Sequence, residues 1–287
     1  MGNTIYKGIL TAEGGKTCLL GESGERFLEN EKIWNGYLKH FHGFKVCARK
    51  LAQRDYETGK EIIIMWPDTP AAEEPFVELY CNERLAKYPT SFLGHLAINV
   101  SGEIFNFSHL LIENEIMKHE EYFFRPALGE FAPHPVFGRY NVGDPQKPYY
   151  DKFGRIFMRT IHVLKIIGLN TETLSQIFCD QLEKIKSTPP DPKAPEKYAD
   201  FNVITNSCAT IIRNGLKKYG LKKIKGGFPR DLFVNVSYYF FCVSSNPKIK
   251  ATRRVLKQLK VDEATPSVMP PLINPVNCWK YKRLKDF

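Results

Sequence analysis

The strongest constraint on the fold of this chain is a sixteen-residue stretch, GHLAINVSGEIFNFSH, which runs from Gly94 to His109. Apolar and polar residues alternate on both sides of Ser101-Gly102, a pair typical of a two-residue turn. A period of two predicts strands, and the short turn predicts that they pair antiparallel. Partner residues in such a hairpin sum to the same number, so we expect Ala97 to lie opposite Asn106.

This register sorts the hairpin into two faces. The apolar face, broken only by Glu103 beside the turn, carries Leu96, Ile98, Val100, Phe105 and Phe107. The other face carries His95, Ala97, Asn99, Ile104, Asn106 and Ser108. There His95 and Asn106 are diagonal neighbours, roughly 7 to 8 Å apart between backbones, a gap that side chains close. The amide can therefore orient the imidazole; a hydrogen-bonded histidine with a purely structural role is the alternative.

A second stretch, FNVITNSCATIIRNGLKKYG (residues 201–220), places Cys208 where a polar run becomes a helical pattern. Residues 201–204 suit a strand or its exit, the next three residues offer side-chain oxygens that cap a helix, and Gly220 ends it. The first turn of a helix stabilises negative charge and favours a thiolate. The alternative is a buried cysteine that acts as a small hydrophobe.

Taken together, GHLAINV, EIFNF and FNVITNSCAT resemble the circularly permuted papain-like fold of the NlpC/P60 superfamily, and the nearest likeness is to the bacterial DUF4105 group. The lecithin retinol acyltransferase and PPPDE peptidase families share the order of histidine before cysteine. The likeness covers roughly residues 87–240. It departs from the DUF4105 pattern in having Asn-Ser-Cys rather than Asn-Asn-Cys, and in offering asparagine where some relatives have histidine.

The resemblance implies a role for each residue of these motifs. Cys208 would be the nucleophile, His95 the general base, and Asn106 the polar residue that holds the imidazole. Asn206, Ser207 and Asn99 would support the site. For Asn206 we expect a helix cap rather than an oxyanion contact, because backbone N–H groups at Cys208 and the adjoining helix start are the better oxyanion donors.

The order of the remaining elements predicts an α+β protein of two domains. Residues 1–86 read as three strands, a helix and two strands, an order similar to that of a small OB-like β-barrel. Residues 87–287 would form the permuted papain-like domain with a basic C-terminal tail. The proline-rich run Pro67–Pro75 predicts a linker, and the boundary is expected between about Pro67 and Ser91. The net charge of residues 1–86, 11 − 13 = −2, argues against nucleic acid as a partner there.

The seven cysteines are scattered and never spaced as Cys-x-x-Cys, so the sequence indicates neither a disulfide framework nor a zinc knuckle. We expect no cofactor and no metal, and we interpret His40 and His42 as a helix-end pair. Cys179 and Cys242 lie in apolar segments that predict burial.

No secretory signal and no membrane-spanning run is expected. Folding in a reducing compartment is compatible with a cytoplasmic location or with export by a leaderless secretion system.

By the resemblance, the expected activity is hydrolysis of an amide bond, most simply in the peptide stems of peptidoglycan. Residues 245–287 hold 10 Lys/Arg and 3 Asp/Glu, which suits an anionic envelope polymer. Within this tail, NPKIKATRRVLKQLK reads as a short basic helix followed by coil. If the chain is a secreted effector, an immunity protein is a natural partner. Two alternatives stay open: a thiol acyltransferase or deamidase acting on lipids or proteins, and a non-catalytic protein that binds anionic ligands.

Overall fold

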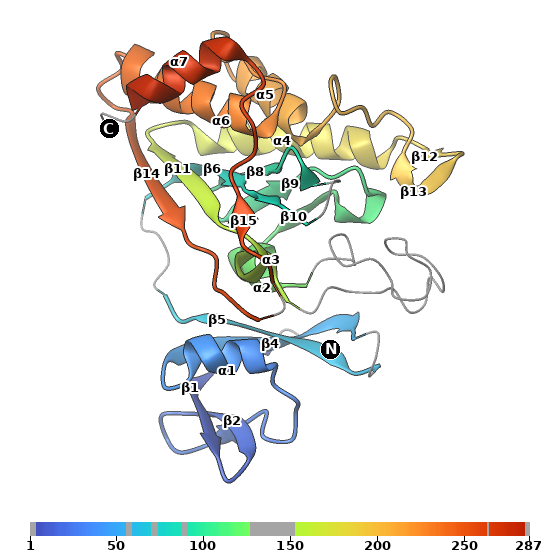
Figure 1. Ribbon diagram of the computed structural model, residues 1–287, viewed down its shortest axis with the longest axis vertical. Helices are drawn as coiled ribbons and strands as arrows, with labels where there is room; N and C mark the ends of the chain where they lie inside the picture. The colour runs from blue at the N-terminus through green and yellow to red at the C-terminus, as the bar shows by residue number, and fades with distance from the viewer. Residues whose placement is uncertain are drawn as a thin grey trace. The chain divides into compact units, whose positions relative to one another are not determined.

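The computed structural model describes residues 4–55, 59–69, 74–87, 91–126, 153–262 and 264–284. The protein is α+β and divides into two compact units (Figure 1). Unit 1 comprises residues 1–71, 120–158 and 259–264, and unit 2 comprises residues 72–119, 159–258 and 265–287. Residues 70–73 of the expected linker lie outside the described residues.

The first unit boundary falls inside the expected interval between Pro67 and Ser91, but a division after residue 86 does not match the units. Strand β6 (Phe76–Asn82) belongs to unit 2, because it pairs along its whole length with two other strands of that unit. Unit 1 also includes segments far along the chain, which a single cut through the sequence does not anticipate.

Unit 1 contains a five-stranded antiparallel sheet in the order β3-β2-β1-β4-β5. Its elements follow the expected order of three strands, a helix and two strands: β1 (Tyr6–Glu13), β2 (Lys16–Leu20), β3 (Arg26–Phe27), α1 (Asn35–Phe41), β4 (Lys45–Arg54) and β5 (Glu61–Pro67). The sheet does not close into the expected OB-like barrel, because β3 and β5 are its edges in the described part of the chain. Two residues in β3 offer too few backbone groups to close it.

An aromatic cluster explains why unit 1 includes residues from the segment 120–158. Helices α2 (His119–Phe124) and α3 (Arg155–Met158) supply Phe124 and Phe157. The ring of Phe157 lies 4.8 Å from that of Trp34 and 5.6 Å from that of Tyr37. The buried Arg49 forms ion pairs with Glu120 and Glu121 in the first turn of α2.

Unit 2 is built on a six-stranded sheet in the order β10-β9-β8-β6-β11-β14, with every neighbouring pair antiparallel. Its hairpin consists of β8 (His95–Val100) and β9 (Glu103–Asn106), and Ala97 pairs with Asn106 as expected. Ser101 and Gly102 have φ angles of 49° and 101°, the positive values that a two-residue hairpin turn requires. The predicted hairpin and its register are therefore confirmed.

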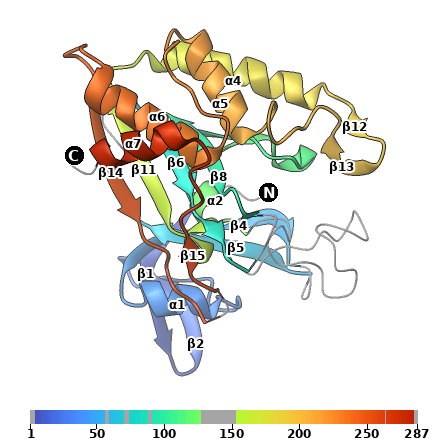
Figure 2. The same cartoon turned by 45° about the horizontal axis from the view of Figure 1, so that its top comes forward.

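Helices cover one face of this sheet (Figures 1 and 2). They are α4 (Thr171–Lys186), α5 (Cys208–Lys218) and α6 (Pro229–Tyr238), which continues into a π-helical turn, η3 (Tyr239–Val243); α7 (Pro275–Arg283) packs against α6. The five residues of the predicted apolar hairpin face all belong to the buried core beneath these helices. Phe178 of α4 illustrates this packing, since its ring lies 5.6 Å from that of Phe105.

The basic segment expected to be helical is instead the edge strand β14 (Lys250–Leu256), which pairs residue by residue with β11 (Ile161–Ile167). Pairing with a neighbouring strand overrides a weak local preference. Conversely, the expected coil contains helix α7.

The remaining short elements are β7 (Arg84–Leu85), η2 (Leu111–Glu113), β10 (Glu115–Met117), β12 (Pro190–Asp191), β13 (Ala194–Tyr198) and β15 (Ser267–Val268). No helix in the described ranges has the length and hydropathy to cross a bilayer.

Candidate active site

The imidazole of His95 and the amide of Asn106 are hydrogen-bonded across the hairpin. His95 Nε2 lies 2.8 Å from Asn106 Oδ1, and Asn106 Nδ2 donates to the carbonyl of Glu113 at 2.8 Å. The second bond sets the orientation of the amide, so an oxygen that only accepts faces the ring. Nε2 therefore carries the proton, and Nδ1 of the neutral imidazole is left as the basic nitrogen. The diagonal contact expected from the register is present.

A buried loop, residues 108–114, holds the hydrogen-bonded pair of His95 and Asn106 in place. Ser108 Oγ donates to Glu113 Oε2 at 3.0 Å, and Asn114 Nδ2 donates to the carbonyls of Ser108 and Leu110 at 2.9 and 2.7 Å. Ser108, Glu113 and Asn114 are all buried. Buried polar groups with their hydrogen bonds made form rigid networks. The loop therefore fixes the carbonyl that orients Asn106, and sequence patterning gave no signal for it.

Gly94, the residue before His95, is held in a conformation that suits glycine. Its φ is +70°, and a Cβ placed there would approach the carbonyl oxygen of Asn82 to 2.5 Å and Cγ of Pro270 to 2.9 Å. Asn82 pairs with His95 across β6 and β8, and its Nδ2 donates to the His95 carbonyl at 3.3 Å. The backbone at the start of β8 is thus held on two sides, which limits movement of the imidazole.

Cys208 is the first residue of α5, as the sequence predicts. Ser207 is the N-cap, and its backbone N–H donates to Thr210 Oγ1 at 2.7 Å. At the other end Gly220 has a φ of 117°, and Leu221 N–H reaches the Leu216 carbonyl at 3.0 Å, which is the Schellman pattern. A helix with well-defined ends presents its N-terminal N–H groups and the positive end of its dipole to the Cys208 thiol.

Asn206 does not cap α5, contrary to expectation. Its Nδ2 donates to the Asp200 carbonyl at 3.0 Å, and its backbone N–H donates to the Asn202 carbonyl at 2.8 Å. The segment forms no extended strand: residues 203–205 are a turn, in which Asn202 Oδ1 accepts from the N–H groups of Ile204 and Thr205 at 2.9 and 3.1 Å. An asparagine side chain that binds the backbone two residues ahead stabilises a turn. Asn206 therefore shapes the loop that leads to Cys208.

Asn99 has a structural role at the far end of β8. Its Oδ1 accepts from Gly102 N–H at 2.8 Å, and its Nδ2 donates to the Tyr80 hydroxyl at 2.9 Å. Tyr80 in turn donates to Glu78 at 2.7 Å. Four residues of strand separate Asn99 from His95, about 13 Å at the usual rise. Asn99 thus stabilises the hairpin turn instead of supporting the histidine.

Helix α5 packs against β8, and Cys208 packs on the same core as Leu96, the residue after His95. Burial raises the pKa of Cys81, the cross-strand partner of Leu96, to about 12; the charge of Arg230 opposes this effect and negative charge on Cys208 adds to it. Burial followed by the charge on Cys208 also raises the pKa of Tyr198, whose hydroxyl donates to the Asn206 carbonyl at 3.3 Å. Cys81 and Tyr198 are thus neutral neighbours of Cys208, and sequence reasoning missed both roles.

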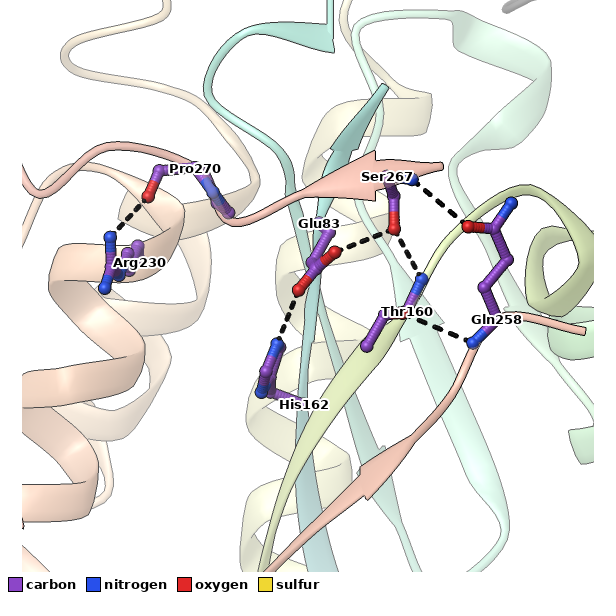
Figure 3. Close-up of polar contacts among 7 residues, drawn as sticks. All are labelled: Glu83, Thr160, His162, Arg230, Gln258, Ser267 and Pro270. Carbon is purple, nitrogen blue, oxygen red and sulfur yellow. Dashed lines mark hydrogen bonds and ion pairs between the residues drawn. The ribbon is translucent and has the colours of Figure 1, made fainter. Parts of the chain in front are cut away.

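A second polar cluster lies at the ends of strands β6, β11 and β15 (Figure 3). Glu83 Oε1 lies 2.9 Å from His162 Nε2, and Glu83 Oε2 accepts from Ser267 Oγ at 2.7 Å. Ser267 Oγ also accepts from the backbone N–H of Thr160 at 2.8 Å. The carboxylate lies between the imidazole and the hydroxyl, so the histidine does not activate the serine as it would in a Ser-His-Asp triad. We therefore interpret this group, which we call the Glu83 cluster, as a structural hydrogen-bond network that connects β6, β11 and β15.

The Glu83 cluster should contribute a free energy of unfolding that depends on pH. Burial alone would raise the pKa of Glu83, but the hydrogen bonds from His162 and Ser267 outweigh burial and lower it. The stabilisation is therefore present above the unfolded pKa of about 4.3 and is lost as pH falls through the lower folded pKa. We expect the unfolding free energy to fall more steeply between pH 6 and pH 3 in the unaltered chain than in Glu83→Gln, as measured by urea unfolding. Parallel pH profiles would contradict this assignment.

The other candidate residues form no metal site. In the described ranges no group of three or more His, Cys, Asp or Glu side chains is arranged to hold a metal ion. His40 Nε2 lies 2.7 Å from the carbonyl of Lys260, which agrees with a structural role. None of the seven cysteines forms a disulfide in the part of the chain that the structure describes. Cys242 is exposed and Cys179 is only half-buried, so the expected burial of Cys242 is wrong.

The fold and the candidate site together define an antiparallel α+β protein with a cysteine at a helix N-terminus and a histidine–asparagine pair on a neighbouring hairpin. A scan against protein-family models, a search of curated proteins and a search of solved structures each found no match to the chain.

Proposed function

We propose that this chain is a cysteine hydrolase that cleaves an amide bond, with a permuted papain-like arrangement of Cys208, His95 and Asn106. The observation that carries the proposal is the hydrogen bond from His95 Nε2 to Asn106 Oδ1, which leaves Nδ1 as the base. This bond lies on the strand against which α5 packs, and Cys208 opens α5. A nucleophile, a base and a group that orients the base are the three parts that such catalysis requires.

In the acylation step, His95 Nδ1 accepts the thiol proton of Cys208, and the thiolate attacks the carbonyl carbon of the substrate. A C–S bond forms while the carbonyl π electrons move to oxygen. The N–H groups of the first turn of α5 are the donors available to that oxyanion. When the intermediate collapses, the C–N bond breaks and the imidazolium gives its proton to the leaving amine.

Deacylation uses the same groups with water as the nucleophile. His95 Nδ1 accepts a proton from water, the hydroxide oxygen attacks the thioester carbon, and the C–S bond breaks. The proton returns to sulfur, so the products are a carboxylic acid and the free thiol of Cys208. Asn106 keeps the ring in one tautomer throughout, because its Oδ1 accepts from Nε2 in both the neutral and the charged ring.

For the substrate we propose the peptide stems of peptidoglycan, on the basis of the resemblance and of the basic C-terminal part of the chain. Chromatography and mass analysis of purified sacculi treated with the protein test this. New free amino and carboxyl ends within stem peptides are the expected result. Acyl transfer between lipids, or release of ammonia from protein glutamine, would instead favour an acyltransferase or a deamidase.

The reactivity of the seven cysteines tests the site independently of the substrate. We expect iodoacetamide at pH 6 to alkylate Cys208 first, because a helix N-terminus and an imidazolium lower a thiol pKa from about 8.5 into the range of roughly 3.5 to 7.5. Peptide mapping by mass spectrometry measures the order. Cys242 and Cys278 are exposed whereas Cys208 is half-buried, so accessibility alone predicts the opposite order.

The matched control for this labelling is His95→Ala. Removal of the imidazolium should slow alkylation of Cys208 at pH 6 and leave the rates of Cys242 and Cys278 unchanged. If Cys278 reacts before Cys208 in the unaltered chain, Cys208 is a structural cysteine and the proposed site is wrong.

A further inference from the structure

Helix α7 carries apolar side chains that the described residues leave exposed. Val276 and Trp279 lie one turn apart on its outer face and are 58% and 51% exposed, and Ile273, just before the helix, is 45% exposed. Single exposed apolar residues are ordinary, but three within seven residues form a patch. We call Ile273, Val276 and Trp279, with Lys280, Lys282 and Arg283, the α7 surface.

The α7 surface is firmly attached to the rest of unit 2. The buried carboxylate of Asp231 accepts from the backbone N–H groups of Ile273 and Asn274, each at 3.0 Å, and from Asn277 Nδ2 at 2.8 Å. Asn274 caps the helix by accepting from Val276 N–H at 3.0 Å. The exposed side chains are therefore presented by a fixed helix, and little conformational entropy is lost when they bind a partner.

The same surface carries positive charge that no carboxylate among the described residues neutralises. Residues 201–284 contain 16 Lys/Arg and 3 Asp/Glu, and one of the three, Asp231, is buried. Within the described ranges, Lys225, Lys280, Lys282 and Arg283 form no ion pair with a carboxylate. Burial and then the nearby charge of Lys225 lower the pKa of Lys280. Cations that repel one another on a fixed surface are stabilised by an external anion.

Aromatic rings position these cations beside the apolar patch. Arg283 lies over the Trp279 ring at 5.4 Å, and Lys280 lies over the Tyr238 ring at 5.4 Å. The Tyr238 and Trp279 rings are themselves 5.6 Å apart. Tryptophan flanked by lysine and arginine favours the boundary between lipid headgroups and acyl chains, where the ring meets an apolar medium and the cations meet phosphate.

We infer that the α7 surface docks this protein on a bilayer rich in anionic phospholipid. Charge complementarity selects an anionic partner, and the aliphatic side chains of Ile273 and Val276 distinguish a bilayer from a soluble polyanion. These side chains neither stack nor form hydrogen bonds, so they gain only from an apolar medium. The docking does not require Cys208 and goes beyond the proposed hydrolase activity.

Binding of the full chain to vesicles tests this inference. We expect co-sedimentation with vesicles of 30% phosphatidylglycerol in phosphatidylcholine and little with phosphatidylcholine alone. Each Lys or Arg near an anionic surface contributes about fivefold to partitioning. Lys282→Glu combined with Arg283→Glu should therefore weaken binding by at least about twenty-five-fold. Trp279→Ala should weaken it further without changing the charge.

The matched control is Lys184→Glu combined with Lys186→Glu, which makes the same change in net charge at exposed positions at the end of α4. It should bind nearly as well as the unaltered chain. A salt titration of the unaltered chain is independent of any variant, and 0.5 M NaCl should release it, because surface charges are screened within about 10 Å even at 0.1 M.

Three results would overturn the inference: equal binding to both kinds of vesicle, equal losses in the α7 and α4 charge variants, or binding that persists in 0.5 M NaCl. Tighter binding to duplex DNA or to a soluble anionic glycan than to the anionic vesicles, in the same buffer, would also overturn the assignment to a bilayer. Cys208→Ala should bind vesicles like the unaltered chain, so failure of the hydrolase proposal remains distinguishable.

Discussion

Replacement of Cys208 by alanine is expected to abolish turnover, with a loss of at least about 10³-fold in kcat, because no thiol remains to form the acyl-enzyme. The release of products from sacculi, followed by chromatography, measures this. Cys208 is half-buried and opens α5, and alanine fits the first turn of a helix, so the fold should be retained. An unchanged far-ultraviolet spectrum would establish this.

The control for this variant is Cys278→Ala, which removes an exposed thiol from α7. Its activity should equal that of the unaltered chain. Full activity in Cys208→Ala would exclude Cys208 as the nucleophile. Equal losses in the two variants would point to a general effect of cysteine removal instead.

Replacement of His95 by alanine is expected to reduce kcat by about 10²-fold to 10⁴-fold, the range that general acid–base catalysis contributes. The remaining activity should rise with pH as the thiol ionises, at a pKa nearer the ordinary value of about 8.5, since only the helix N-terminus then favours the thiolate. The pH dependence of kcat/KM measures this shift. A His95→Ala profile that parallels the original would mean that the imidazole is not the base.

Asn106 provides a finer test, because it acts through His95. Asn106→Ala removes the acceptor that sets the tautomer, and we expect kcat to fall by about 10²-fold while KM changes little. Asn106→Asp restores an acceptor and adds a charge that stabilises the imidazolium, so it should recover activity and shift the basic pKa of the profile upward. A purely structural role for Asn106 predicts equal losses in both variants.

Local sequence patterns were sufficient for the elements that bear the candidate site. The alternation from Gly94 to His109 and the Ser101-Gly102 turn determine a hairpin, and a hairpin of known turn length has only one register. The diagonal relation of His95 and Asn106 follows from that register. The sequence also predicts the start of α5 at Cys208 and its end before Gly220, because caps are local interactions between neighbours in the chain.

The expectations from sequence differ from the structure where contacts with distant segments override the local preference of a segment. The segment Lys250–Leu256 has no strong pattern of its own and became a strand because β11 offers it a row of backbone partners. The expected barrel stayed an open sheet because closure depends on β3, which extends for only two residues. Asn206 lost its expected capping role because a backbone carbonyl six residues earlier accepts from its side chain.

The sequence by itself therefore determined the hairpin, the position of Cys208 at the N-terminus of a helix, and the positive charge of the C-terminal part. Only the tertiary structure decided that Phe124 and Phe157 complete the core of unit 1, that Tyr198 and Cys81 neighbour Cys208, and that Glu83 joins His162 to Ser267. The physical reason is the range of the interactions. Turns, caps and alternation act between residues a few positions apart, whereas burial and ion pairing bring together residues whose separation along the chain leaves no periodic signal.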